Sequence, residues 1–294
     1  MKILNFGSCN LDYVYRVEHI VREGETLSAS SRAVFPGGKG LNQSIAITRA
    51  GGTVWHAGRI GPEGTMLRAL CEEAGVRTDF LEETDVPTGH TVIQVDAQGQ
   101  NSILVFGGAN QSIDSQMIER VLLHFGAGDL LVLQNEISNI PELVERASAL
   151  GMQIACNPSP WNAAAADIDL SKITLLFINE VEGEQITGTA DPKEMLKALG
   201  ARYPDLKVVL TLGSQGSCCL IRGHITREKG FPVTPVDTTG AGDTYTGYFL
   251  RSYAAGMPIA HAMRLASMAA AISVTRPGAV PSIPRLSEVM AKYS

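Results

Sequence analysis

The sequence contains no apolar run long enough to cross a membrane, and its cysteines do not have the spacing of a metal site. Their number is odd and most lie in apolar segments, so we expect reduced, buried thiols in a cytoplasmic protein. A signal peptide is not expected, because the chain begins directly on a strand-like segment, residues 2–6. The five cysteines are Cys9, Cys71, Cys156, Cys218 and Cys219.

Positive charge is also scarce, since 24 Lys and Arg residues oppose 30 Asp and Glu residues and the formal net charge is −6. This balance disfavours a nucleic acid or an anionic membrane as a partner. The Walker loop GxxxxGK[ST] is absent, and no GxGxxG follows the first strand, which disfavours a dinucleotide-dependent oxidoreductase. With 294 residues, of which 45% are apolar, the chain is suited to one large α/β domain or to a domain with a small appendage.

Buried-strand patterns recur along the chain, and polar residues follow each of them. The patterns cover residues 3–7, 130–133, 153–156, 173–178 and 207–212. Because the carboxyl ends of parallel strands share one edge of a sheet, we expect the polar residues along one rim. Asn10 and Asp12 could bind sugar hydroxyls there, or only stabilise a turn. Glu136 and Glu182 could be ligands, or capping or solvated carboxylates.

Four other segments alternate apolar and polar residues, which is typical of strands exposed on one face. They cover residues 13–16, 26–35, 88–96 and 102–106, and the last two are joined by a hairpin signal at residues 97–100. We expect them to form a small separate sheet that covers one edge of the main domain. The prediction is a single domain, 1–294, with a lid sub-domain from approximately 12–36 and 88–107.

The segment VDTTGAGDTYTGYF, residues 236–249, leads from an extended stretch into an apolar helix. Gly240 and Gly242 at the helix start allow amide N–H groups to converge, and the helix dipole adds positive potential, so the place suits an anion. Asp243 beside such a pocket makes sense as a base that takes a proton from a hydroxyl attacking a phosphate. The alternative is a glycine turn with Asp243 as a capping residue.

The loop PGGKGLNQ, residues 36–43, precedes a helix that ends near Gly51. Its glycines would bring the backbone close to a small polar ligand, with Asn42 reaching that ligand from the helix start. A plain loop-to-helix junction is the alternative interpretation.

Four motifs together resemble the ribokinase-like, or PfkB, family of sugar kinases. They are Asn10-Leu11-Asp12, the run GGKGLNQ from Gly37, residues 179–182 (NEVE), and DTTGAGD from Asp237 to Asp243. The resemblance covers nearly the whole chain. It implies a Rossmann-like three-layer α/β/α fold with a central, mostly parallel sheet and a small β-sheet lid. It also implies transfer of the ATP γ-phosphate to a sugar hydroxyl, with Mg²⁺ and a monovalent cation (K⁺), and a homodimer joined through the lids.

The resemblance also assigns roles to residues at matching positions. Asp243 would be the base, and the amides of Gly240, Ala241 and Gly242 would form an anion hole. Residues expected at the sugar are Asn10, Asp12, Gly38, Lys39, Asn42 and Glu136. Residues expected at the nucleotide are Asn179, Thr211, Gly213, Ser214 and Gly216. Glu182 would organise Mg²⁺, and the monovalent-cation residues would be Asp237, Thr239, Ser273, Arg276, Gly278 and Ser282.

Two departures from the family pattern concern specificity. Ser267 stands where ribokinases place an adenine-side asparagine, so the nucleotide contacts are expected to differ. His90 follows Thr88-Gly89, where phosphosugar kinases usually place an arginine, and Gln94 lies further along. The missing arginine favours an unphosphorylated sugar, ribose or a related pentose, with His90 at the substrate. The alternatives are a nucleoside kinase, a kinase for another free sugar such as fructose, and a non-catalytic sugar-binding regulator.

Overall fold

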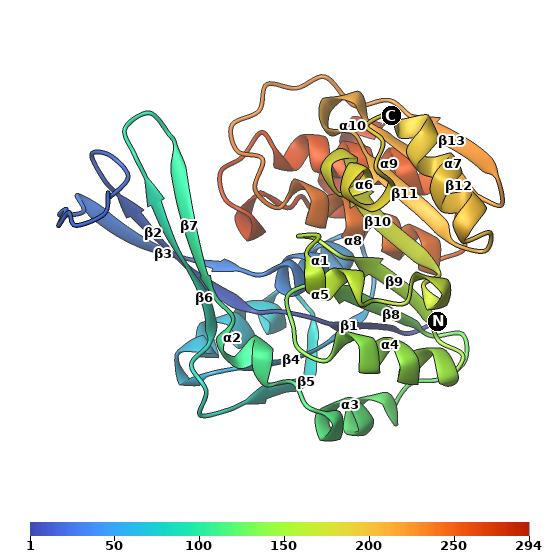
Figure 1. Cartoon of the computed structure of the whole chain (residues 1–294), viewed down its shortest axis with the longest axis horizontal. Helices are drawn as coiled ribbons and strands as arrows, with labels where there is room; N and C mark the ends of the chain where they lie inside the picture. The colour runs from blue at the N-terminus through green and yellow to red at the C-terminus, as the bar shows by residue number, and fades with distance from the viewer. Residues whose placement is uncertain (294) are drawn as a thin grey trace.

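The main body of the protein is built on a nine-stranded sheet. A computed structural model describes residues 1–293 (Figure 1). Seven neighbouring strands are parallel, and β12 and β13 continue the sheet in antiparallel orientation. From one edge to the other, the strands are β13 (His224–Glu228), β12 (Ser217–Ile221), β11 (Lys207–Thr211), β10 (Leu175–Asn179), β9 (Gln153–Asn157), β8 (Leu130–Gln134), β1 (Ile3–Phe6), β4 (Val54–Ile60) and β5 (Arg77–Glu83).

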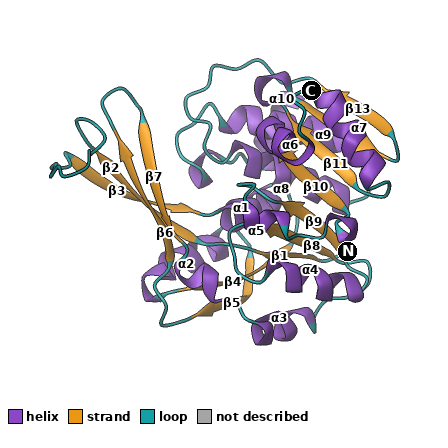
Figure 2. Ribbon diagram, viewed as in Figure 1, coloured by secondary structure: helices purple, strands orange, loops and turns teal. Residues whose placement is uncertain are grey.

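Helices cover both faces of this sheet and create two hydrophobic cores (Figure 2). Successive strand residues point to opposite faces, so Ile3 joins one core and Leu4 the other. The helices of the first core are α1 (Lys39–Arg49), α2 (Thr65–Glu73), α8 (Ala241–Ala254), α9 (Ile259–Ser273) and α10 (Leu286–Tyr293). Those of the second are α3 (Ser115–Leu122), α4 (Ile140–Ala149), α5 (Ala163–Ala166) and α7 (Pro192–Arg202), with α6 (Glu180–Thr187) at its border.

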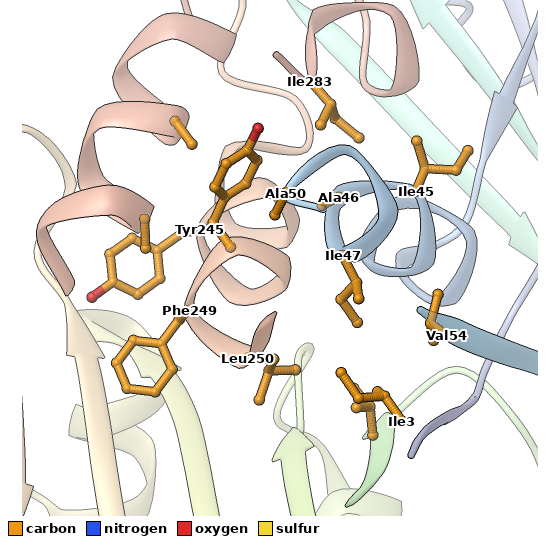
Figure 3. Packing of buried hydrophobic residues seen from close by; sticks show 14 of the residues in the cluster. Ile3, Ile45, Ala46, Ile47, Ala50, Val54, Tyr245, Phe249, Leu250 and Ile283 are labelled. Atoms are coloured by element: carbon orange, nitrogen blue, oxygen red, sulfur yellow. The ribbon is translucent and has the colours of Figure 1, made fainter. Parts of the chain in front are cut away.

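The close packing of α1 against α8 positions the two helix starts that carry the predicted site (Figure 3). A Cβ at Gly247 would lie 2.3 Å from Cβ of Ala46, so glycine permits this approach. Around the contact, Ile47 and Phe249 are fully buried, and each such side chain contributes roughly 1.5–3 kcal/mol. The packing of α1 against α8 therefore brings Lys39 and Asp243 into the same pocket.

A second sheet of four strands projects from the main body (Figure 1). β2 pairs with β3 in antiparallel and with β6 in parallel orientation, and β7 forms the outer edge beside β6. The side chains of β7 are exposed along its whole length. The strands are β2 (Asn10–Arg16), β3 (Ser31–Gly37), β6 (Gly89–Val95) and β7 (Asn101–Phe106).

The predicted fold class, a mostly parallel sheet between helical layers with a small extra β-sheet, is confirmed. The prediction that residues 26–35 form a strand is wrong for its first part, because β3 begins at Ser31. Residues 26–30 instead form an irregular connection between β3 and a preceding turn, in which the Arg22 carbonyl accepts from the Glu25 amide at 3.1 Å. Within residues 1–293 no helix is long and apolar enough to cross a bilayer.

Candidate active site

A pocket of about 220 Å³ lies at the carboxyl edge of the parallel strands, where the first turns of α1, α6 and α8 meet. The strand-end rule predicted this location. The pocket is lined by Lys39, Asn157, Ser159, Phe177, Ile178, Asn179, Glu182, Thr211, Thr238, Gly240, Gly242, Asp243 and Thr246.

Asp243 lies in the first turn of α8 and is 6% exposed. Its Oδ2 accepts from Nδ2 of Asn42 at 2.9 Å, and its Oδ1 accepts from Nε2 of Gln43 at 2.9 Å. Burial raises the pKa of Asp243, while Lys39 and the two amide donors lower it, and the net direction is upward. A buried carboxylate with a raised pKa and access to a pocket suits a general base.

The start of α8 provides the anion-binding geometry. Gly240 is the N-cap in the left-handed region, with φ 72°, and an added Cβ would lie 3.1 Å from that of Ala279. First-turn amides such as that of Gly242 have no acceptor within the helix, so they can bind an anion with help from the helix dipole. The Ala241 amide donates to the Thr238 carbonyl at 3.3 Å, a long bond with which an anion can compete.

Lys39 brings positive charge into the same pocket from the first residue of α1. Attraction by Asp243 raises the pKa of Lys39 against the lowering effect of burial, and Glu136 adds to the rise. Glu136 is held close by, because its Oε2 accepts from Ser8 Oγ at 2.5 Å and from the Lys39 amide at 2.9 Å. The Lys39 ammonium is therefore charged and faces the carboxylate that would act as base.

The predicted sugar residues Asn10 and Asp12 project from one face of β2, two positions apart. Oδ1 of Asp12 accepts from Thr91 Oγ1 at 2.6 Å, and burial is the main reason that the pKa of Asp12 is raised. Oδ1 of Asn10 accepts from Asn110 Nδ2 at 2.7 Å. Gly37, the last residue of β3, pairs with Asn10 of β2 and completes this corner of the small sheet.

The loop before α1 approaches the same corner. Gly38 has φ 94°, and an added Cβ would lie 3.0 Å from the Ser8 carbonyl oxygen, so the position requires glycine. Asn42 was predicted to reach the sugar, and the structure uses its Nδ2 to hold Asp243. Its Oδ1 is buried and has no hydrogen-bond partner among the described residues.

His90 is not brought together with the predicted sugar residues. In the register of β2 and β6, Thr91 stands beside Asp12, whereas His90 stands beside Leu11 and so projects from the opposite face. There its ring packs against those of Tyr13, at 5.7 Å, and Phe106, at 4.9 Å between centroids.

The predicted nucleotide residues gather at the ends of β10 and β11. Asn179 and Glu182 form a capping box at the start of α6, with the Asn179 side chain accepting from the Glu182 amide at 2.9 Å. The capping interpretation of Glu182 therefore holds, and its side chain also lines the pocket. Thr211 ends β11 and leads into the turn that contains Gly213, Ser214 and Gly216. Ser267 is buried within α9 and is not among the pocket residues.

The six residues predicted for a monovalent cation form a loop cluster behind the start of α8. The Asp237 carboxylate accepts from the Thr239 amide and hydroxyl and from the Gly278 amide, at 2.6–2.9 Å. Partial burial would raise the pKa of Asp237, but these hydrogen bonds hold it below its ordinary value. The Arg276 amide donates to the Ser273 carbonyl, and Ser282 Oγ donates to the Ala279 carbonyl.

Sequence reasoning missed the supporting residues of the site: Gln43, Thr91, Asn110 and Gln134. Both glutamines lie in segments that the sequence analysis singles out. Gln43 belongs to the GGKGLNQ run, and Gln134 directly follows the strand pattern at residues 130–133. Thr91 and Asn110 lack such a signal, because their contacts depend on pairings between distant segments.

Comparisons with known proteins match this chain to one family over nearly its whole length. The family model of pfkB family carbohydrate kinases matches residues 1–286. The chain is 34% identical over 290 residues to the ribokinase of Bacillus subtilis, with 96% of each chain covered. It is 32% identical over 293 residues to that of Haemophilus influenzae, with 97% of this chain and 95% of the relative covered. The structure of Arabidopsis thaliana ribokinase complexed with ribose and ATP superposes with a TM-score of 0.88 at 28% identity, covering 100% of this chain and 98% of that one.

Proposed function

Because the chain belongs to the pfkB family of carbohydrate kinases, we propose that it transfers the γ-phosphoryl group of ATP to a hydroxyl of free ribose or a related pentose. The observation that best supports this is the position of Asp243, a buried carboxylate beside the amide-rich start of α8 and facing Lys39. Phosphoryl transfer depends mainly on such positioning and charge stabilisation.

In the proposed reaction, the sugar hydroxyl attacks the γ-phosphorus while Asp243 accepts its proton. The first-turn amides of α8, including that of Gly242, and the Lys39 ammonium stabilise the charge on the transferring group. Asn10 and Asp12 hold the other hydroxyls of the sugar from the small sheet. Closing this sheet over the site would exclude water and limit wasteful hydrolysis of ATP.

An unphosphorylated substrate is supported by the segment from Thr88 to Thr91, which has no arginine for a substrate phosphate. The ribokinase relatives support ribose. The direct test is to measure ADP formation with ribose, deoxyribose, fructose, other pentoses, fructose 6-phosphate and nucleosides. We expect the highest kcat/KM with ribose or another free pentose. Preference for inosine or adenosine over every sugar would identify a nucleoside kinase instead.

Gly37 provides a specific test of the sugar corner. A Cβ at this position would lie 2.0 Å from Oδ2 of Asp12, so alanine must displace that carboxylate. We expect Gly37→Ala to raise the KM for the sugar by about 10–100-fold, the cost of losing a charge-assisted hydrogen bond, with the KM for ATP unchanged. Steady-state kinetics with each substrate varied separately measures this.

The matched control for that variant is Gly126→Ala, since an added Cβ there meets no described atom within 4 Å. It is expected to leave both KM values unchanged. An unaltered sugar KM in Gly37→Ala would argue against Asp12 as a sugar ligand.

The residues near the pocket fit Mg²⁺, which is commonly held by one or two carboxylates together with substrate phosphates. Glu182 supplies such a carboxylate, which is 5% exposed and lines the pocket. Its Oε2 also accepts a hydrogen bond of 3.1 Å from the Asn179 backbone amide. When bound, Mg²⁺ would neutralise phosphate charge. Glu182 would hold it through water.

The loop cluster at Asp237 fits a monovalent cation, because it concentrates carboxylate and carbonyl oxygens beside the start of α8. We propose that K⁺ binding there fixes the loop joined by the Asp237–Gly278 hydrogen bond of 2.8 Å. Activity is then expected to rise with KCl and not with NaCl at equal ionic strength. Equal rates in the two salts would remove this assignment.

We further propose that the protein works in the cytoplasm as a homodimer joined through its small sheets. In support of the dimer, the outer strand β7 exposes Leu104 by 69% and Val105 by 65%, and exposed apolar patches of this kind mark protein interfaces. In support of a reducing compartment, all five cysteines are free thiols.

A further inference from the structure

A chain of buried side-chain amides connects Asp243 with the centre of the main sheet. Oδ1 of Asp243 accepts from Gln43 Nε2 at 2.9 Å, and Gln43 Oε1 accepts from Gln134 Nε2 at 2.8 Å. The same Nε2 of Gln134 donates to Asn5 Oδ1 at 2.9 Å. Gln43 and Asn5 are 0% exposed and Gln134 is 1% exposed. Four elements, α8, α1, β8 and β1, thus meet through one polar connection.

The direction of this chain is fixed at both ends. Asn5 Nδ2 donates to the Gly40 carbonyl at 2.8 Å, and a carbonyl can only accept, so Asn5 Oδ1 must be an acceptor. Gln134 must therefore present its NH₂ group, and Gln43 Oε1 receives one of the two protons. The NH₂ group of Gln43 is then directed at Asp243. Reversing any one amide would place two acceptors or two donors against each other.

The space around Gln134 is shaped for this orientation. A Cβ at Gly7, directly after β1, would lie 2.3 Å from Gln134 Oε1 and 2.7 Å from Cα of Gly40, so this close approach requires glycine. That Oε1 has no hydrogen-bond partner among the described residues. An unpaired buried acceptor is costly, and the two bonds made by Nε2 offset this cost. The side chain is therefore placed for its donors.

We propose that Gln43 is a positioning residue for the base, and that Gln134 fixes the orientation of the Gln43 amide. The proposal rests on the proposed role of Asp243. Asn42 holds Oδ2 and Gln43 holds Oδ1, from successive residues of α1. The carboxylate is thereby held in one orientation toward the pocket. Gln134 donates to Gln43 Oε1 and is itself oriented by Asn5, so the Gln43 amide cannot turn its oxygen toward Asp243.

The amide of Gln43 also affects the proton affinity of the base. The charged groups near Asp243 are Lys39 on α1 and Glu136 after β8, while Glu182 on α6 acts on Lys39. Burial raises the pKa of Asp243, and donation from Gln43 lowers it because the bond favours the ionised form. Removing that donor raises the pKa further. Since the base must be ionised, activity is then lost at a higher pH as the solution is acidified.

The test uses Gln43→Met and Gln134→Met, which keep the approximate side-chain volume and remove the amides. We expect Gln43→Met to lower kcat by about 10–100-fold, the cost of losing a hydrogen bond to a charged group. The KM for ATP should stay within about twofold, and the acid limb of the kcat profile should move to higher pH. Gln134→Met should also lower kcat and move the acid limb to higher pH, each by a smaller amount.

Ser44→Ala is the matched control. Ser44 is 0% exposed, stands next to Gln43 on α1, and accepts from Asn5 Nδ2 at 2.9 Å on a branch that leads to His56 rather than to Asp243. It should lower the melting temperature without moving the acid limb. Nucleotide binding by each variant, measured by calorimetry, reports that the protein is folded.

An unchanged acid limb in Gln43→Met, or an equal shift in Ser44→Ala, would overturn the positioning role. If Gln43→Met does not fold, Gln134→Met decides, because it leaves both direct donors to Asp243 in place. Near-normal turnover of Asp243→Asn would instead reject Asp243 as the base, so the two failures are distinguishable.

Discussion

Replacing Asp243 by asparagine is expected to lower kcat by about 10²–10⁴-fold, the usual range for the loss of a general base. The side chain keeps its size, but its amide cannot accept the proton of the sugar hydroxyl. ATP affinity should remain nearly unchanged, since the first-turn amides of α8 and Lys39 are still present. Stopped-flow or steady-state ADP formation, together with calorimetric titration of ATP, measures the two quantities separately.

The pH dependence of kcat in the wild-type protein should report the ionisation of Asp243. Burial raises the pKa of Asp243 above the ordinary carboxyl value. The ionised base is present above this raised pKa and is lost as the pH falls through it, so the acid limb of kcat lies at a higher pH than that of an exposed carboxylate. Asp243→Asn should lack this limb in its residual activity.

Asp191→Asn is a suitable control, because it removes one carboxylate charge while asparagine can still cap α7 as Asp191 does. It should leave kcat and the pH profile unchanged. If Asp243→Asn retained turnover close to the wild type, Asp243 would not be the base, and the site would need another proton acceptor.

Replacing Lys39 by methionine is expected to lower kcat/KM by about 10²–10³-fold, a loss comparable to removing one preorganised electrostatic group. The half-buried Lys39 side chain lines the pocket, and its pKa is raised first by Asp243 and further by Glu136 and Glu182. Without it these carboxylates repel one another and the phosphates of ATP. The pKa of Asp243 also rises, since Lys39 is the largest influence lowering it, and the acid limb should move to higher pH.

Lys197→Met provides the comparison for this variant. Lys197 is 55% exposed and pairs with Glu194 at 2.7 Å on the surface of α7, where such pairs contribute little. Its removal changes the net charge by the same amount and should leave the kinetics unaltered. Similar small effects from both lysine variants would show that Lys39 does not stabilise the transferring phosphoryl group.

The parts of the site that could be predicted from sequence lie within short contiguous motifs. The glycines and Asp243 at the start of α8, and Lys39 at the start of α1, depend on local helix-start geometry that the sequence records directly. The rim of polar strand ends follows from the general topology of parallel sheets. These rules suffice to bring Lys39 and Asp243 into one pocket.

What could not be predicted depends on pairing between distant segments. The alternation around His90 indicates a strand, but only the register with β2 shows that Thr91, not His90, shares a face with Asp12. The strands β12 and β13 also escaped prediction, because their antiparallel return depends on pairing beside β11.

Asn42 illustrates the same limit within a recognised motif. Its place at the helix start predicts a sugar ligand, and the structure adds that its Nδ2 holds Asp243, which is 201 residues away in the chain. The amide chain through Gln43 and Gln134 spans 91 residues between those two side chains. Such contacts require the packing of α1 against both the sheet and α8, which no local pattern specifies.

The protein is expected to phosphorylate a free sugar at the expense of ATP. This is tested most directly by incubating the purified protein with ribose, ATP, Mg²⁺ and K⁺ and following the phosphorus-containing compounds by ³¹P NMR. We predict one sugar phosphomonoester formed for each ADP, and no turnover when the sugar is omitted. Nucleotide binding without phosphomonoester from ribose or any other free sugar, or release of inorganic phosphate alone, would show that the protein is not a sugar kinase.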